Sequence, residues 1–361
     1  MNTHTTDAAG LHKIIKIEAL RGLAALYVLL HHALPHKYML GGFNLYNFFR
    51  LGQEAVILFF LLSGFVIKYS FAISSDKSFK RYFFRRFFRL YIPLAFVMFI
   101  GYLIVSHKQG YLISVDLLHL VGNLLMLQDW ADAKPHVFVD PFLGNNPLWS
   151  LAYEWWFYML FYPFATFIKS DALRNKVVFS ISIVAAVVYI TQPYFPVRII
   201  MYFSIWWTGV ILAECYLNQS SFKYRDIFLP IVSLLAIISA LSMDVYLAKY
   251  DNQKITFGYH PLLELRHFIW ALIVVVAAIH WRSKKWILFN YIVRPFAIVA
   301  PISYTIYILH WYVMIDSGFL EVVSNPVLRW FSYLLLLLAL SYIIEIIMYP
   351  RLRKRFSRLL Q

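Results

Sequence analysis

The stretch LGQEAVILFFLLSGFVIKYSFA, residues 51–72, decides the fold class. It carries only two charged side chains, Glu54 and Lys68. A run of about 20 mostly apolar residues is what a helix needs to cross the hydrocarbon core of a bilayer. We therefore predict a membrane-spanning helix here.

The rest of the chain repeats this pattern. Of its 361 residues, 61% are apolar and 14% charged, against about 45–50% and about 25% in soluble proteins. This composition excludes a soluble globular enzyme and predicts an all-α integral membrane protein, a bundle of about ten transmembrane helices in a single domain over 1–361. The expected spans are 18–38, 51–72, 90–107, 148–168, 177–192, 197–216, 227–247, 263–281, 296–315 and 327–349.

The charge pattern sets the expected orientation. Of the 33 Lys and Arg residues, 24 fall on one side of these spans and 9 on the other. Because cytoplasmic loops are enriched in Lys and Arg, we expect both termini in the cytoplasm and the acidic 108–147 segment outside. The net charge of +15 then needs no nucleic acid partner. The single cysteine, Cys215, excludes an intramolecular disulfide and a cysteine-cluster metal site.

The first span contains two ionisable side chains with helical spacing. Arg21 and His32 are 11 positions apart, which places them on one helix face about 16 Å apart, whereas His31 points about 80° away. Ionisable groups inside spans are functional candidates. The structural alternative is that Arg21 reaches lipid phosphate while His32 bonds to a neighbouring helix.

A basic stripe precedes the third span. Arg81, Arg85 and Arg89 recur at four-residue intervals, with Arg86 beside them. Guanidinium groups make forked contacts with phosphate, so the stripe fits a polyphosphate ligand such as coenzyme A. Anchoring on anionic lipid explains the same stripe equally well.

The fourth span opens with Trp149 and Ser150, followed by Glu154. A carboxylate about 9 Å below the membrane boundary needs a partner or a raised pKa. The tryptophans alone also fit an interfacial aromatic belt.

Two further motifs place polar groups inside spans. Ser63 and Gly64 are typical of a close contact between helices. Tyr304 and His310 lie in the ninth expected span, where a lone histidine is usually a hydrogen-bonded core residue.

Together these stretches resemble the membrane acyltransferase-3 family, which includes O-antigen and peptidoglycan O-acetyltransferases. The motifs occur in the family's order over roughly residues 17–311. The matching elements are Arg21 to His32, Phe59-Phe60 to Phe65, Arg85-Arg86 to Pro93, Trp149 to Tyr158 and Ser303 to His310.

Some positions depart from the family pattern. Many members have an acid shortly before the paired phenylalanines, where this chain has Ile57, with Glu54 three residues earlier. Family members often have a second acid directly after the position of Glu154, where this chain has Trp155. Many relatives also carry an appended soluble domain, which we do not expect in this chain.

The resemblance implies transfer of an acetyl group from acetyl-CoA, without a metal, to a hydroxyl of a cell-envelope saccharide, at the bacterial plasma (inner) membrane. The expected catalytic set is His32 as general base, Glu154, which would orient the His32 ring or stabilise its protonated form, and Arg21. A transient acyl-histidine is the rival mechanism. The expected donor-binding set is Arg85, Arg86, Arg89 and Ser63, and the remaining motif residues expected near substrate are Trp149, Ser150, Tyr304 and His310. The expected partners are the saccharide, acyl-CoA and the lipid bilayer, with no nucleic acid.

Two other function classes stay open. Buried Arg, His and Glu also suit a proton-coupled transporter, although repeated halves with interrupted helices, typical of carriers, are not evident in the sequence. A glycosyltransferase would use an acidic metal or base site in the 116–140 segment.

Overall fold

The computed structural model describes residues 4–34, 39–40, 43–44, 46–218 and 224–359. It is helical, with one short hairpin of two-residue strands, β1 (Met39–Leu40) and β2 (Phe43–Asn44). Among the described residues, seven helical stretches are long and apolar enough to cross a membrane. They are Tyr46–Ala72, Phe79–Gln109, Asp171–Thr191, Phe195–Leu217, Arg225–Tyr250, Leu262–Ser283 and Pro326–Arg358.

The chain forms two compact units, which we describe separately. Unit 1 comprises residues 1–55, 87–115 and 281–361, and unit 2 comprises residues 56–86 and 116–280. Each unit therefore combines segments that are far apart in the sequence.

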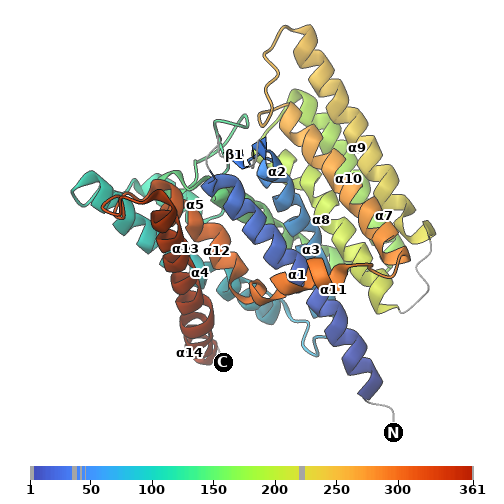
Figure 1. Ribbon diagram of the computed structural model, residues 1–361. Helices are drawn as coiled ribbons and strands as arrows, with labels where there is room; N and C mark the ends of the chain where they lie inside the picture. The colour runs from blue at the N-terminus through green and yellow to red at the C-terminus, as the bar shows by residue number, and fades with distance from the viewer. Residues whose placement is uncertain (1–3, 35–38, 41–42, 45, 219–223, 360–361) are drawn as a thin grey trace. The chain divides into compact units, whose positions relative to one another are not determined.

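Unit 1 is built around α1 (His4–Ala33), which packs against α12 and the short helices before it (Figure 1). Its other elements are α-helices and short 3-10 or π-helical segments. They are α2 (Tyr46–Phe49), the start of α3 (Gly52–Ala72), α4 (Phe79–Gln109) from residue 87, α11 (Phe289–Ile292), η3 (Arg294–Ile298), η4 (Ala300–Ile302), α12 (Ser303–His310), η5 (Trp311–Asp316), α13 (Pro326–Tyr342), η6 (Ile343–Met348) and α14 (Tyr349–Leu359).

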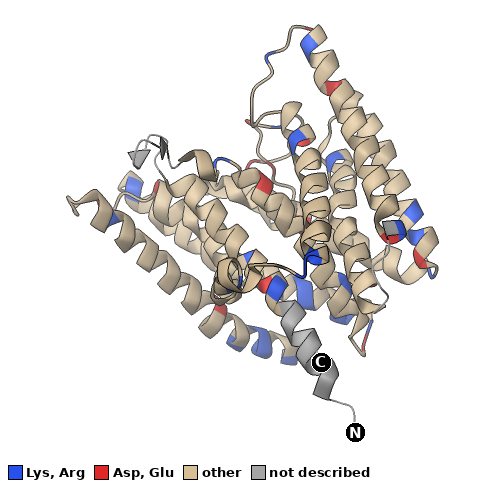
Figure 2. Cartoon of the chain, turned by 45° about the vertical axis from the view of Figure 1, so that its right-hand side comes forward, with Lys and Arg blue, Asp and Glu red and all other residues tan. Residues whose placement is uncertain are grey.

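Unit 2 is a helical bundle in which α7, α8 and α9 lie side by side (Figure 1). Its elements are most of α3 (Gly52–Ala72), the start of α4, α5 (Leu117–Leu124), η1 (Phe142–Gly144), η2 (Asn146–Leu148), α6 (Trp149–Phe167), α7 (Asp171–Thr191), α8 (Phe195–Leu217), α9 (Tyr224–Tyr250) and α10 (Leu262–Ser283). Figure 2 shows that the long helices α9 and α10 carry their charges towards the ends, with uncharged stretches between, as a bilayer core requires.

Local sequence signals explain several helix ends. The Ser170 side chain accepts a hydrogen bond from the backbone N–H of Leu173 and caps α7. Asn325 caps α13 in the same way, with Pro326 in the first turn, where a missing N–H costs nothing.

The predicted close helix contact at Gly64 is confirmed. A Cβ atom on Gly64 would lie 2.0 Å from the backbone oxygen of Trp206, and one on Gly209 would lie 2.0 Å from that of Leu61. The backbones of α3 and α8 therefore approach each other at a distance that only glycine permits.

The expected span at 296–315 is not one continuous helix. It consists of η3, η4, α12 and the π-helical turn η5. Pro295 and Pro301 lie at the starts of η3 and η4, and a proline cannot donate the backbone hydrogen bond that continues an α-helix. Only residues 303–316 form an uninterrupted helical segment.

Candidate functional site

The site in unit 1 is centred on two histidines from distant parts of the chain. His32 lies near the end of α1 and His310 at the end of α12. The distance between His32 Nδ1 and His310 Nε2 is 3.0 Å, and the two rings stack with centroids 5.1 Å apart. His310 is fully buried, while His32 is half-buried. The structure thus brings together two residues that the sequence analysis placed in separate motifs.

The hydrogen bonds assign a tautomer to each ring. The backbone oxygen of Ile306, which can only accept, lies 3.2 Å from His310 Nδ1, so that nitrogen carries the proton. In a neutral ring, His310 Nε2 is then an acceptor, and His32 Nδ1 must donate to it. The remaining nitrogen of His32, Nε2, consequently has a lone pair with which it can accept a proton or attack a carbonyl.

The adjacent His31 has different neighbours. Its Nδ1 lies 2.6 Å from the backbone oxygen of Phe49, and its ring stacks on Tyr46 of α2 and lies close to Gly52. The two histidines therefore face different elements, as their positions on one helix predicted. Arg21 lies 11 residues before His32 within α1 and is half-buried.

A carboxylate site lies in unit 2. Ser63 of α3 donates a hydrogen bond of 2.9 Å to Glu154 Oε1, and the Tyr158 hydroxyl, one turn further along α6, donates to the same oxygen. The indole N–H of Trp206 lies 3.2 Å from Ser63 Oγ. Glu154 thus has the partners that a carboxylate inside a span requires. Ser63, expected near the donor, is one of them.

Glu154 and His32 belong to different units. Within the units as described, His32 bonds to His310, and Glu154 bonds to Ser63 and Tyr158. The predicted contact between Glu154 and His32 stays a prediction.

The basic stripe lies on α4, but its arginines have different partners. Arg86 donates to Ser70 Oγ at 2.6 Å and lies over the rings of Tyr82 and Tyr158, whereas its buried Nε has no hydrogen-bond partner among the described residues. Arg85 donates a longer bond, 3.4 Å, to Ser74 Oγ. Arg86 therefore keeps an unused donor for an anionic ligand.

Arg89 is tied to an acid that the sequence analysis missed. Its Nη1 lies 2.5 Å from Oε2 of Glu345 in η6, and its guanidinium lies over the rings of Tyr304 and Tyr349. The other oxygen of Glu345 accepts from Thr305 at 3.1 Å. Glu345 is the one carboxylate in the tenth expected span, and its position alone could have marked it as a residue that needs a charged partner. Because Arg89 neutralises a buried acid, it has less capacity for a phosphate than Arg86.

The remaining predicted residues are packed into helix contacts. Trp149 is 5% exposed and lies in the core of unit 2 rather than in an interfacial belt, with its ring parallel to that of His267. Ser150 donates to the backbone oxygen of Pro147 in the first turn of α6. The Tyr304 hydroxyl donates to the backbone oxygen of Leu90.

The segment expected as an acidic outer loop contains a buried ion cluster. Asp129 accepts hydrogen bonds from Lys134 Nζ (2.6 Å), Arg198 Nη1 (2.6 Å) and the Tyr153 hydroxyl (2.7 Å). Burial raises the pKa of Asp129, but Lys134 and Arg198 outweigh burial and hold that pKa below its usual range. Burial lowers the pKa of Lys134 to about 8, against the opposing effect of Asp129.

This ion cluster gives no support to a metal-dependent glycosyltransferase. Both oxygens of Asp129 are engaged by cations and Tyr153. In the part of the chain that the structure describes, no three His, Cys, Asp or Glu side chains are grouped so that they could hold a metal ion.

Comparison with known proteins gives one family and one curated relative. A family model described as an acyltransferase domain matches residues 14–346. Acyltransferase MdmB of Streptomyces mycarofaciens is 31% identical over 185 residues, which cover 49% of this chain and 46% of that protein. The matched region thus spans about half the length of the curated relative. No solved structure matches the chain.

Proposed function

Because the chain belongs to the acyltransferase-3 family, we propose that it is a membrane O-acyltransferase that moves an acetyl group from acetyl-CoA to a hydroxyl of a cell-envelope saccharide. The observation that carries this proposal is the His32–His310 pair, which leaves a lone pair on His32 Nε2. An oriented imidazole with a basic nitrogen that can accept a proton is what activation of a hydroxyl requires.

In the proposed reaction His32 acts as general base. Its Nε2 accepts the proton of the sugar hydroxyl while the sugar oxygen attacks the thioester carbonyl. The carbon–sulfur bond then breaks, and the coenzyme A thiolate takes the proton from Nε2. Throughout, His32 Nδ1–H donates to His310, which fixes the orientation of the His32 ring.

The rival mechanism uses the same nitrogen as a nucleophile. His32 Nε2 would attack the thioester, release the thiolate and hold the acetyl group until the sugar oxygen displaces it, and the proton of the sugar hydroxyl would pass to the thiolate. In the general-base mechanism, Glu154 is proposed as the acid that orients the His32 ring or stabilises its protonated form, and Arg21 as a basic anchor on the same face of α1 as His32.

Arg86 is the proposed main contact for the phosphates of coenzyme A. We expect Arg86→Gln to raise the dissociation constant for coenzyme A by about tenfold or more, because a hydrogen bond to a charged group contributes about 1.5–3 kcal/mol. Isothermal titration of the purified full chain in detergent measures this change.

The matched control is Arg89→Gln on the same helix. This change leaves Glu345 buried without its cation, so we expect a lower melting temperature but nearly unchanged coenzyme A affinity. If Arg86→Gln binds coenzyme A like the wild type, Arg86 is not a phosphate contact. If Arg89→Gln is the variant that loses affinity, the two roles are reversed.

The proposal includes the membrane arrangement. The excess of Lys and Arg on one side supports ten spans with both termini in the cytoplasm of a bacterial cell, and the family match over 14–346 supports a single acyltransferase domain. The cytoplasm holds acyl-CoA, so a donor site on this side suits the basic stripe.

Mass spectrometry of surface polysaccharide tests the proposed acceptor. Cells that make the protein should carry acetyl groups on a polysaccharide that is unmodified in cells lacking it. Identical polysaccharides from both cell types would contradict the saccharide as acceptor.

A further inference from the structure

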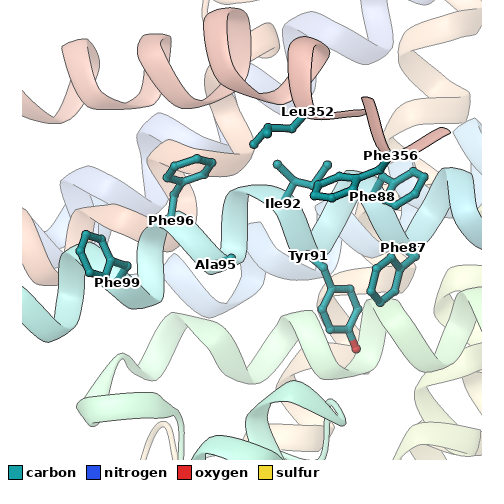
Figure 3. Close-up of a pocket in the computed structure, with 9 residues that line it drawn as sticks. All are labelled: Phe87, Phe88, Tyr91, Ile92, Ala95, Phe96, Phe99, Leu352 and Phe356. Atoms are coloured by element: carbon teal, nitrogen blue, oxygen red, sulfur yellow. The ribbon is translucent and has the colours of Figure 1, made fainter. Parts of the chain in front are cut away.

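A mostly apolar groove lies in unit 1 between α4 and α14. It has a volume of about 520 Å³, and its lining includes Phe88, Tyr91, Ala95 and Phe99 from α4 and Leu352 and Phe356 from α14 (Figure 3). The Tyr91 hydroxyl is the one polar side-chain group among its lining residues. A lining with one hydroxyl offers too few partners for a sugar or for the amides of pantetheine, but it suits a hydrocarbon chain.

The length of the groove matches one leaflet of a membrane. From Phe87 to Phe99 the lining follows 13 residues of α4, a rise of about 18 Å along the helix. This is about half of the roughly 30 Å hydrocarbon core. Phe87 and Phe99 lie at opposite ends of the groove in Figure 3.

The helix α14 beside the groove is strongly basic. The exposed basic residues of α14 are Arg351, Arg353, Lys354, Arg355 and Arg358. On this helix, Arg353 and Arg355 project about 80° to either side of the stripe formed by Leu352 and Phe356. The Phe356 ring stacks on Phe88, with centroids 6.0 Å apart, so these arginines flank the Phe88 end of the groove.

We propose that this groove is a binding site for an anionic phospholipid. One acyl chain occupies the groove along α4, and the phosphate group is held by Arg353 and Arg355. Two cations beside the headgroup favour an anionic over a zwitterionic lipid, because each basic residue near the surface contributes to attraction of anionic lipid. This site is separate from the proposed acyl-transfer residues, and its test does not depend on enzyme activity.

Native mass spectrometry of the full chain in detergent, titrated with phosphatidylglycerol or phosphatidylcholine of identical acyl chains, tests the headgroup preference. We expect half-saturation with phosphatidylglycerol at a concentration at least about tenfold lower than with phosphatidylcholine. In the double variant Arg353→Gln with Arg355→Gln, the half-saturating concentrations of the two lipids should differ by no more than about twofold. Lys284→Gln with Lys285→Gln, exposed residues of the same unit, removes equal charge and should leave the preference intact.

A second pair of variants tests the groove itself. Ala95→Phe fills it and should weaken the binding of both lipids, whereas Leu103→Phe, at an exposed position further along α4, should not. Equal binding of the two lipids by the wild type, an equal loss in the Lys284/Lys285 variant, or unchanged binding by Ala95→Phe would each overturn the proposal.

Discussion

His32→Ala is expected to lower the rate of acyl transfer by at least about 100-fold, since general base catalysis contributes roughly 10²–10⁴-fold. The reason is the loss of Nε2, the ring nitrogen that the bond to His310 leaves with a lone pair. His31→Ala should retain most of the activity, because His31 bonds to Phe49 on a different side of α1. Rates with acetyl-CoA under saturating conditions compare the two variants.

His310 provides the control for the hydrogen bond. His310→Gln keeps a side-chain oxygen that can accept from His32 Nδ1, whereas His310→Phe keeps the ring volume but no acceptor. We expect the Gln variant to retain more activity than the Phe variant. Equal activity of His31→Ala and His32→Ala, or of both His310 variants, would refute the assigned roles.

Asp129→Asn is expected to lower the free energy of unfolding by about 3–5 kcal/mol. The change leaves Lys134 and Arg198 as buried cations without their common counter-ion. Cys215 is the single cysteine and is buried, so its reaction with a thiol-specific dye reports unfolding of unit 2. The same assay on Asp132→Asn, an exposed aspartate in the same segment, should show a change within about 0.5 kcal/mol.

The same cluster predicts a loss of stability in acid. The pKa of Asp129 is lower in the folded chain than its ordinary value of 3.8, so the unfolded chain binds the proton first as the pH falls. The stabilisation by Asp129 is complete above this ordinary value and is lost as the pH falls through the folded pKa. In Asp129→Asn, the free energy of unfolding should therefore depend less on pH in this acid range. An unchanged acid profile in that variant would contradict the role of Asp129.

The apolar windows of the sequence predicted the helices because a helix in the bilayer core needs a continuous run of apolar residues, which is visible in the local sequence. Residues 51–72, for example, form α3 almost to the residue. The break in the 296–315 window had a sequence signal, since Pro295 and Pro301 both interrupt it, but its high apolar content favoured one span.

The long-range contacts were beyond sequence reasoning. Helical spacing separated His32 from His31, but nothing local pairs His32 with a residue 278 positions later. Asp129 lies in the 108–147 segment that we expected outside, and nothing in the sequence shows that it forms a buried ion pair with Arg198. Such pairs depend on how the helices pack, which apolar periodicity alone does not encode.

Thiol release from acetyl-CoA by purified protein tests the central claim most directly. The protein is supplied with cell-envelope saccharide, and free thiol is measured for the wild type, His31→Ala and His32→Ala. The proposed acyltransferase predicts saccharide-dependent release by the wild type and His31→Ala, with a loss of about 100-fold or more in His32→Ala. Absence of release by the wild type, as a transporter predicts, or release by His32→Ala at the wild-type rate would contradict the account.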